Sequence, residues 1–450
     1  MTSLIHGSTP VDPSYGVTCD AGTTAPFMGV GAPARTAPLG NNTKLSANRV
    51  SCGLESNPSK YVLRAVAQSV LGRSHRISSC QKVPSYSVQQ GEKERGISKN
   101  EDGKAFFHGV GACGDVHTCP VCSHKISESR RQELLSALRC HRESGRIALL
   151  ATFTFPHFCT DALSINLDLF RKARSRMVAS RRFKDMKKTL GMIGYVRRLE
   201  VTWGEANGWH PHDHEIWFID KPDITKKELK DIEHAMWELW SIHCEKVGLS
   251  IPSRSHGFDL RYNDQQYGDA VGAYLTKWGH ELTYGHTKMT RGDRRHTPFS
   301  ILAHLDKHGY HPLYHHLFRE YAKTFKGRAQ LLWSQGLKMH FAIDSVSDEE
   351  ISDRPEPVHH CEITKEQHTA ISLLNLFSEV LHFAEKHTPQ QTIEFMDRIV
   401  EYKNKPSIFW SAINNDQNFR NFRKHLGKII SDEISEQRTS TNGNAERVSA

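Results

Sequence analysis

The sequence lacks an apolar run as long as a membrane span requires, and it lacks the basic-then-apolar start of a signal peptide. It also has no internal repeat, and its ten cysteines in 450 residues are too few for a disulfide framework that replaces a hydrophobic core. We therefore expect a globular cytoplasmic protein that does not contact a membrane and keeps its thiols reduced. A chain of this length can form two or three domains.

Acidic residues are outnumbered by basic ones, which gives a net charge of +9 and favours a polyanionic partner, with nucleic acid as the first candidate. The excess is concentrated in residues 171–189, a predicted helical segment with nine lysines and arginines and one acidic residue. A solvated helix face is the alternative interpretation. We expect DNA phosphates to bind there, and six residues are the candidates: Arg171, Lys172, Arg174, Arg176, Arg181 and Arg182.

A group of cysteines precedes this basic segment, and two of them form the turn Cys119-Pro-Val-Cys122. Such a turn presents two thiolates to one tetrahedral ion, and Cys80 and Cys113 can supply the other two ligands of a structural zinc. The alternative is a redox pair, which usually lies at the strand-to-helix turn of a βαβ unit, and no convincing strand precedes this turn. Three histidines are rival ligands: His108, His117 and His124.

Three histidines alternate at positions 210, 212 and 214 and lead directly into the apolar residues 215–219. The apolar run predicts a buried strand, and side chains at i and i+2 of a strand share one face about 7 Å apart. His210, His212 and His214 therefore point the same way. Imidazole is a common ligand of divalent metals, so this face is a candidate metal site. Surface or core histidines are the alternative.

A second strand is predicted at residues 193–203, and the turn that follows it contains Gly204, Asn207 and Gly208. The two strands therefore form a hairpin in this interpretation. Folding the hairpin about that turn places Glu200 opposite the histidines, where its carboxylate could be a third metal ligand. An exposed strand carboxylate is the equally weighted alternative.

A predicted helix near residues 267–278 carries two tyrosines and a lysine on one face. Tyr267 and Tyr274 differ by about 20° around a helix, and Lys277 lies one turn beyond Tyr274. Capping boxes also predict helix starts at Thr225 and Thr364.

With these motifs in this order, the sequence resembles the replication initiators of rolling-circle plasmids, which belong to the HUH endonuclease superfamily. The cysteine group resembles that family's zinc-binding cysteines, and residues 152–154 (Thr-Phe-Thr) resemble its first strand motif. Residues 210–214 resemble its metal motif, Tyr274-Leu-Thr-Lys277 resembles its nucleophile helix, and residues 325–338 resemble its C-terminal stretch. The combination is specific, although each motif alone is not.

The resemblance implies an α+β fold, with a central antiparallel sheet flanked by helices as the HUH endonuclease core. A zinc-binding region precedes this core and a small helical domain follows it. The expected boundaries run in order along the chain: a disordered arm at 1–60, the zinc-binding region and a helix at 61–145, the endonuclease domain at 146–345, a linker at 346–363, the helical domain at 364–430 and a disordered tail at 431–450.

The resemblance also implies a mechanism. His212 and His214 would hold a divalent ion, Mg or Mn, with Glu200 and then His210 as further candidate ligands. Tyr274 would attack a phosphate of single-stranded DNA and stay bound to the 5′ end, leaving a 3′-OH primer that can later be used to rejoin the strand. Lys277 would stabilise the developing charge. Expected partners are single-stranded and duplex origin DNA and the helicase and polymerase of a bacterial host.

Two positions depart from the family's pattern. Asp213 stands where an apolar residue is usual, and Ala270 stands where some relatives have a glutamate that activates water at the end of the cycle. Tyr267 is therefore our first candidate for the closing strand transfer. The rival interpretations are another HUH strand transferase, such as a relaxase or transposase, or a non-catalytic DNA-binding protein that contains zinc.

Overall fold

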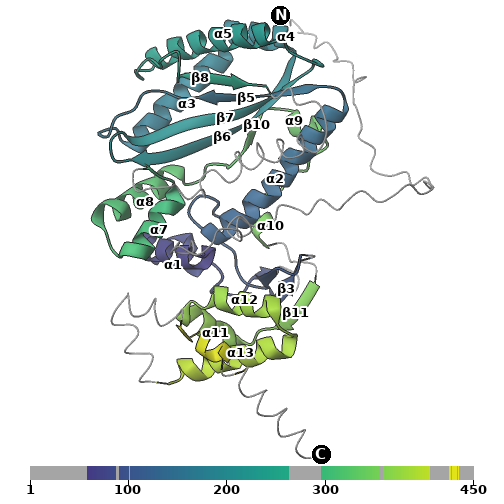
Figure 1. The fold of residues 1–450 in the computed structure, drawn as a ribbon, viewed down its shortest axis with the longest axis vertical. Helices are drawn as coiled ribbons and strands as arrows, with labels where there is room; N and C mark the ends of the chain where they lie inside the picture. The colour runs from purple at the N-terminus through teal and green to yellow at the C-terminus, as the bar shows by residue number, and fades with distance from the viewer. Residues whose placement is uncertain are drawn as a thin grey trace, which may run out of the picture.

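The computed structural model describes residues 58–87, 91–100, 102–262, 295–353, 358–405, 425–426, 428–432 and 434 (Figure 1). Most of the predicted N-terminal arm and C-terminal tail lies outside these residues. The predicted nucleophile helix, with Tyr267, Tyr274 and Lys277, also lies outside them.

A six-stranded sheet in which every pairing is antiparallel forms the upper part of the molecule in Figure 1, with helices on both faces, and this confirms the predicted α+β class. The strand order is β10-β6-β7-β5-β8, and β9 pairs with the far end of β6. The bounds are β5 Ile147–Phe153, β6 Met192–Gly204, β7 Gly208–Ile219, β8 Phe258–Arg261, β9 Arg295–His296 and β10 Leu332–Trp333.

The long hairpin β6–β7 is the predicted one, and its register pairs Glu200 with His212 and Gly204 with Gly208. Gly208 has a φ of +70°, and a Cβ there would lie 2.9 Å from the Cα of Cys159. Only glycine fits both the left-handed conformation and this close approach. The turn therefore fixes which residues of the two strands face each other.

One face of the sheet is covered by α3 (Leu163–Ala179), α4 (Arg181–Leu190) and α5 (Lys226–Glu245). The odd-numbered residues of β7 point to this face, and Trp217 packs there with Phe170 and Met177 of α3 and Trp240 of α5. The even-numbered residues Ile216 and Phe218 point to the other face, where Leu134 and Leu138 of α2 (Pro120–Glu143) cover them. Because the three histidines are even-numbered, they share the α2 face, and the basic helices cover the opposite one.

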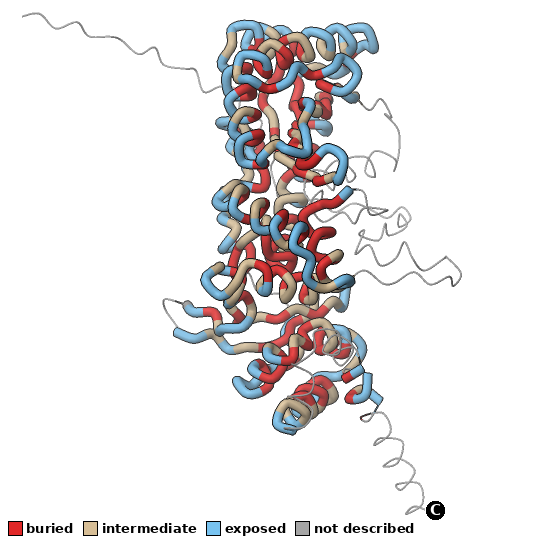
Figure 2. The backbone as a smooth tube through the Cα atoms, turned by 90° about the vertical axis from the view of Figure 1, so that its left-hand side faces the viewer, coloured by how far each residue is buried: buried red, intermediate tan, exposed pale blue. Residues whose placement is uncertain are grey.

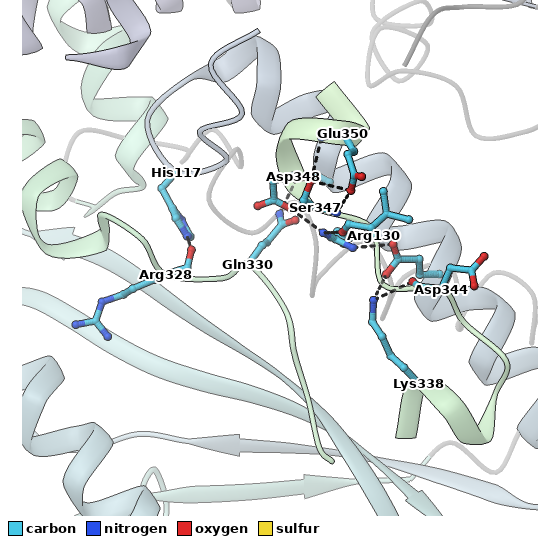
Figure 3. Close-up of polar contacts among 12 residues, drawn as sticks. His117, Arg130, Arg328, Gln330, Lys338, Asp344, Ser347, Asp348 and Glu350 are labelled. Carbon is cyan, nitrogen blue, oxygen red and sulfur yellow. Dashed lines mark hydrogen bonds and ion pairs between the residues drawn. The ribbon is translucent and has the colours of Figure 1, made fainter. Parts of the chain in front are cut away.

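The end of the hairpin packs on α7 (Pro298–His308) and α8 (Pro312–Phe325), with Trp203 and Trp209 buried against them. After α8 the chain passes β10 and α9 (Leu337–His340) and is tied to α2 by polar contacts (Figure 3). Arg130 of α2 donates to Asp348 Oδ1 (2.7 Å) and to the carbonyl oxygen of Val346 (2.7 Å).

We predict residues 346–363 as a linker, but the described residues of this segment, 346–353 and 358–363, contain regular structure. It contains α10 (Asp348–Asp353) and β11 (Val358–Glu362), and β11 pairs with β3 in a three-stranded sheet, β11-β3-β4. The backbone hydrogen bonds of β11 are thus made with a strand that lies far away in the sequence. The two histidines of β11 and the neighbouring prolines do not predict such a pairing. The N-terminal region that receives it consists of α1 Lys60–Leu71, the 3-10 helix η2 Arg76–Ser79, β1 Tyr86–Ser87, β2 Gly91–Glu92, β3 Gly96–Lys99 and β4 Ala105–His108.

Within residues 365–405, β11 is followed by α11 (Lys365–Leu374), α12 (Phe377–Lys386) and α13 (Pro389–Lys403). The predicted capping boxes at Thr225 and Thr364 are present. Buried residues occupy the interior both around the six-stranded sheet and among α11, α12 and α13 (Figure 2). One apolar cluster contains residues of α1, α8, α12 and α13. None of the described helices is both long and apolar enough to span a bilayer.

Candidate metal centre and nucleic-acid interface

Three side chains converge on the α2 face of the sheet: Glu200 from β6, and His212 and His214 from β7. Glu200 Oε2 lies 3.5 Å from His212 Nε2 and 3.9 Å from His214 Nε2. Ligand atoms on one octahedral ion with bonds near 2.1 Å lie about 3.0 to 4.2 Å apart. The three groups therefore fit one divalent ion, and each of the three residues is of intermediate burial.

Hydrogen bonds on the other ring nitrogens orient both imidazoles. His214 Nδ1 lies 3.0 Å from Thr152 Oγ1 on β5, and His212 Nδ1 lies 3.3 Å from the carbonyl oxygen of His210. A histidine that donates through Nδ1 keeps a lone pair on Nε2, the atom that faces Glu200. A contact from β5 and one within β7 itself thus orient both rings with Nε2 toward Glu200.

Arg198, two residues before Glu200 on the same strand face, holds the other oxygen of that carboxylate. Its Nε lies 3.4 Å from Glu200 Oε1, and the two side chains are only 4% and 10% exposed. Burial on its own raises the pKa of Glu200, but the His212 hydrogen bond and the Arg198 and histidine charges outweigh it, so the pKa lies below its usual range. The carboxylate therefore stays charged with Oε2 directed at the histidines.

We expect Arg198→Met to weaken Mn²⁺ binding about 10- to 100-fold, the range found when a group that orients a metal ligand is removed. Isothermal titration calorimetry of the purified chain measures this. Arg261→Met is the matched control, because Arg261 is exposed on β8 and pairs with Asp259 instead. Equal Mn²⁺ affinity in the Arg198 and Arg261 variants would contradict the role of Arg198.

His210, the third candidate from the motif, lies outside the converging group. Its ring packs 4.5 Å from that of His157, and burial, followed by the His212 and His157 charges, lowers its pKa to about 3. It is therefore neutral at pH 7. On the opposite face of the strand, Asp213 is fully buried 3.6 Å from Arg197, so a buried ion pair occupies the position where the family usually has an apolar residue.

The basic segment divides into exposed and buried residues. Arg171, Lys172, Arg176, Arg181 and Arg182 are exposed on α3 and α4, so they remain available to a polyanion.

Arg174 does not belong with them, and its prediction as a DNA contact is wrong. It is 2% exposed and donates to Glu215 Oε1 at 2.8 Å, while Trp217 Nε1 donates to Glu215 Oε2 at 2.8 Å. The signal was in the sequence, because Arg174 lies on the helical stripe of Phe170 and Met177 and so faces the core. Through its ion pair with Glu215, Arg174 connects α3 to β7 on the face opposite the three histidines.

The four predicted cysteines form a second candidate metal site. Cys80 Sγ lies 3.6 Å from both Cys119 Sγ and Cys122 Sγ, and Cys113 Sγ lies 3.6 Å from Cys122 Sγ. Sulfurs around a tetrahedral zinc with 2.3 Å bonds lie about 3.8 Å apart, whereas a disulfide would bring them to about 2.05 Å. All four thiols are buried. The rival histidines lie elsewhere: His108 contacts Ser98, and His117 contacts the carbonyl oxygen of Arg328.

Thr152, Arg198 and His157 have no assigned role in the sequence prediction. Strand alternation does place Arg198 on the face of Glu200, and Thr152 lies in the first strand motif, so a signal existed for both. The contact of His157 with His210 depends on the path of the chain after β5, which no local pattern gives.

Residues 106–246 match the model of a family described as replication protein. A protein named rep from Streptomyces lividans is 25% identical over 317 residues, covering 57% of this chain and 69% of that protein. A neomycin resistance protein from Streptomyces cyanogenus is 30% identical over 144 residues, and a rep protein from Lentilactobacillus hilgardii is 29% identical over 126 residues. These two matches cover 27% of this chain each, and 33% and 38% of those proteins.

No solved structure matches the chain. The stretch that matches the family model contains Glu200, both metal-site histidines and three of the four cysteines, and it ends before Tyr274. The matches confirm the predicted resemblance to replication initiators.

Proposed function

We propose that this relative of plasmid replication proteins initiates rolling-circle replication by nicking one strand of its origin. The observation that carries the proposal is the convergence of Glu200, His212 and His214 on one face of the sheet, inside the segment that matches the family model. Related strand transferases, such as relaxases and transposases, share this chemistry and are the second candidate.

In this proposal Glu200, His212 and His214 would hold a Mg²⁺ or Mn²⁺ ion. The ion would act as a Lewis acid that polarises the scissile phosphate. Two nitrogens and one oxygen suit such an ion, and three protein ligands leave room for phosphate oxygens. Thr152 and Arg198 keep the ligands in place. The four cysteines hold a structural zinc, which stabilises the N-terminal region rather than taking part in the reaction.

Tyr274 is the proposed nucleophile. Its phenolic oxygen attacks the phosphorus and forms a phosphotyrosyl bond to the 5′ end; the bond to the 3′ oxygen breaks, and that oxygen takes up a proton while the phenol loses one to solvent. The segment that carries Tyr274 leaves from β8 and returns at β9, which pair with β5 and β6, the two neighbours of the histidine strand. Both attachment points thus flank the proposed metal site. Lys277 stabilises the developing negative charge, and Tyr267 serves the closing strand transfer.

The exposed basic residues of α3 and α4 bind duplex origin DNA through its phosphates in this proposal. They cover the face of the sheet opposite the histidines, so duplex binding and nicking occupy separate surfaces. The protein acts in the cytoplasm of a bacterial host, where the 3′-OH that it releases is extended by host polymerase behind a host helicase.

The test is incubation with Mn²⁺ and single-stranded oligonucleotides that tile the origin region of the plasmid or chromosome that encodes the chain. A cleaved strand joined covalently to the protein, resolved by denaturing gel electrophoresis, is the expected product. Binding of these oligonucleotides and of the duplex without any adduct would instead indicate a non-catalytic zinc protein. Rejoining to a second oligonucleotide would show that the phosphate bond energy is retained.

A further inference from the structure

A buried arginine without an acidic partner among the described residues lies beside the cysteine cluster. Arg64 of α1 is fully buried. Its Nη1 donates to Gln81 Oε1 at 3.4 Å, a long contact with a neutral amide, and its Nε and Nη2 have no hydrogen-bond partner in the described part of the chain. A buried guanidinium without a counter-charge is strongly unfavourable.

Arg64 is held between the cysteines and the C-terminal helices. Its guanidinium carbon lies 4.1 Å from the ring centroid of Phe377, the first residue of α12, and 5.4 Å from that of Tyr61. On the other side is Gln81, the residue that directly follows Cys80, and its side-chain oxygen accepts the hydrogen bond from Arg64. The guanidinium thus lies between two aromatic rings and the residue that follows one of the four cysteines.

A tetrahedral zinc with four thiolates carries a net charge of 2−, because four negative sulfurs outweigh one divalent cation. We propose that Arg64 is the internal counter-charge of this zinc–thiolate centre, and that its stacking on Phe377 couples metal binding to the docking of α12. The positive charge of the guanidinium, whose Nε and Nη2 have no hydrogen-bond partner in the described part of the chain, and the negative charge of the zinc–thiolate cluster then stabilise each other. This inference rests on the proposed zinc and is independent of the nicking activity.

Cation–π contact alone is the competing explanation, since guanidinium groups stack favourably on aromatic rings. The two explanations differ in how they depend on the metal. If stacking alone retains Arg64, its replacement weakens the protein equally with and without zinc. If Arg64 balances the zinc centre, its replacement weakens zinc binding but spares or stabilises the zinc-free protein, from which a buried charge has been removed.

The experiment compares Arg64→Met, which keeps length and removes charge, with Arg64→Lys, which keeps charge and loses the planar stack. Arg73→Met is the matched control, because Arg73 is exposed just after α1. Zinc content is measured by elemental analysis and zinc affinity by competition with a chromogenic chelator. We expect about 10- to 100-fold weaker zinc binding in Arg64→Met, a smaller loss in Arg64→Lys and no change in the control.

Each result decides one point. A wild-type chain without tightly bound zinc overturns the zinc site itself, whatever the nicking assay gives. Wild-type zinc affinity in Arg64→Met, or an equal loss in the Met and Lys variants, overturns the role of the charge. Hydrogen exchange tests the coupling: chelating the zinc should speed exchange of the α12 amides in the wild-type protein, and unchanged α12 exchange would overturn it.

Discussion

Tyr274→Phe is expected to abolish strand cleavage and covalent attachment together. Phenylalanine keeps the aromatic ring and removes only the hydroxyl that we propose attacks the phosphate, so binding to the oligonucleotide should persist. Loss of a catalytic nucleophile lowers turnover by at least about a thousandfold in other enzymes, and we expect a comparable loss here. Denaturing electrophoresis measures the adduct, and mass spectrometry of the wild-type adduct should locate the DNA on Tyr274.

Tyr267→Phe is the informative comparison. It should still form the adduct but fail to complete the closing transfer to a second strand end. An adduct on Tyr267 or Tyr262 in the wild-type protein would show that the nucleophile has been chosen wrongly. Normal rejoining by Tyr267→Phe, together with stalling of Asp269→Ala after the nick, would instead indicate a carboxylate that activates water.

His212→Ala and His214→Ala are expected to remove metal-dependent nicking and leave duplex origin binding nearly intact. Each variant deletes one of the three ligand atoms around the proposed ion, and we expect nicking to fall at least about a hundredfold. Duplex affinity should change little because the exposed arginines and lysines that can neutralise phosphates lie across the sheet. Nicking is measured on labelled oligonucleotides with added Mn²⁺, and duplex binding by fluorescence anisotropy.

The reciprocal variant is Arg181→Gln combined with Arg182→Gln. It should weaken duplex binding and lower the slope of log affinity against log salt by about two, one for each phosphate that the protein no longer neutralises. Nicking of a single-stranded oligonucleotide should stay near the wild-type rate. Full metal-dependent cleavage by either histidine variant would refute the metal site, and an unchanged salt slope would refute the basic surface.

Local patterns were sufficient for the parts of the molecule that depend on neighbours in sequence. The capping boxes follow from a threonine and the residue three positions later, and the hairpin follows from two apolar runs around Gly208. Once the hairpin was given, Glu200 had to face the histidines. The cysteine cluster was predictable because four thiols in one region have few other ways to be satisfied.

Other features depend on contacts between distant segments, and composition misled the prediction there. The count of basic residues included Arg174, although a carboxylate from β7 neutralises it in the core. Prolines around β11 suggested a linker, although its backbone groups pair with a strand near the start of the described chain. Arg64 gave no signal, because only the fold brings Phe377 and the residue after Cys80 to this arginine.

The pairing of β3 with β11 has a consequence for how the protein is made. A ribosome completes β3 long before it reaches β11, and until then one edge of β3 is an open template for strands of other chains. The N-terminal sheet therefore cannot be completed while the chain is still being synthesised through the six-stranded sheet. We expect versions that end before residue 358 to self-associate through β3, so that the chain from β11 onward acts as the internal partner that covers this edge.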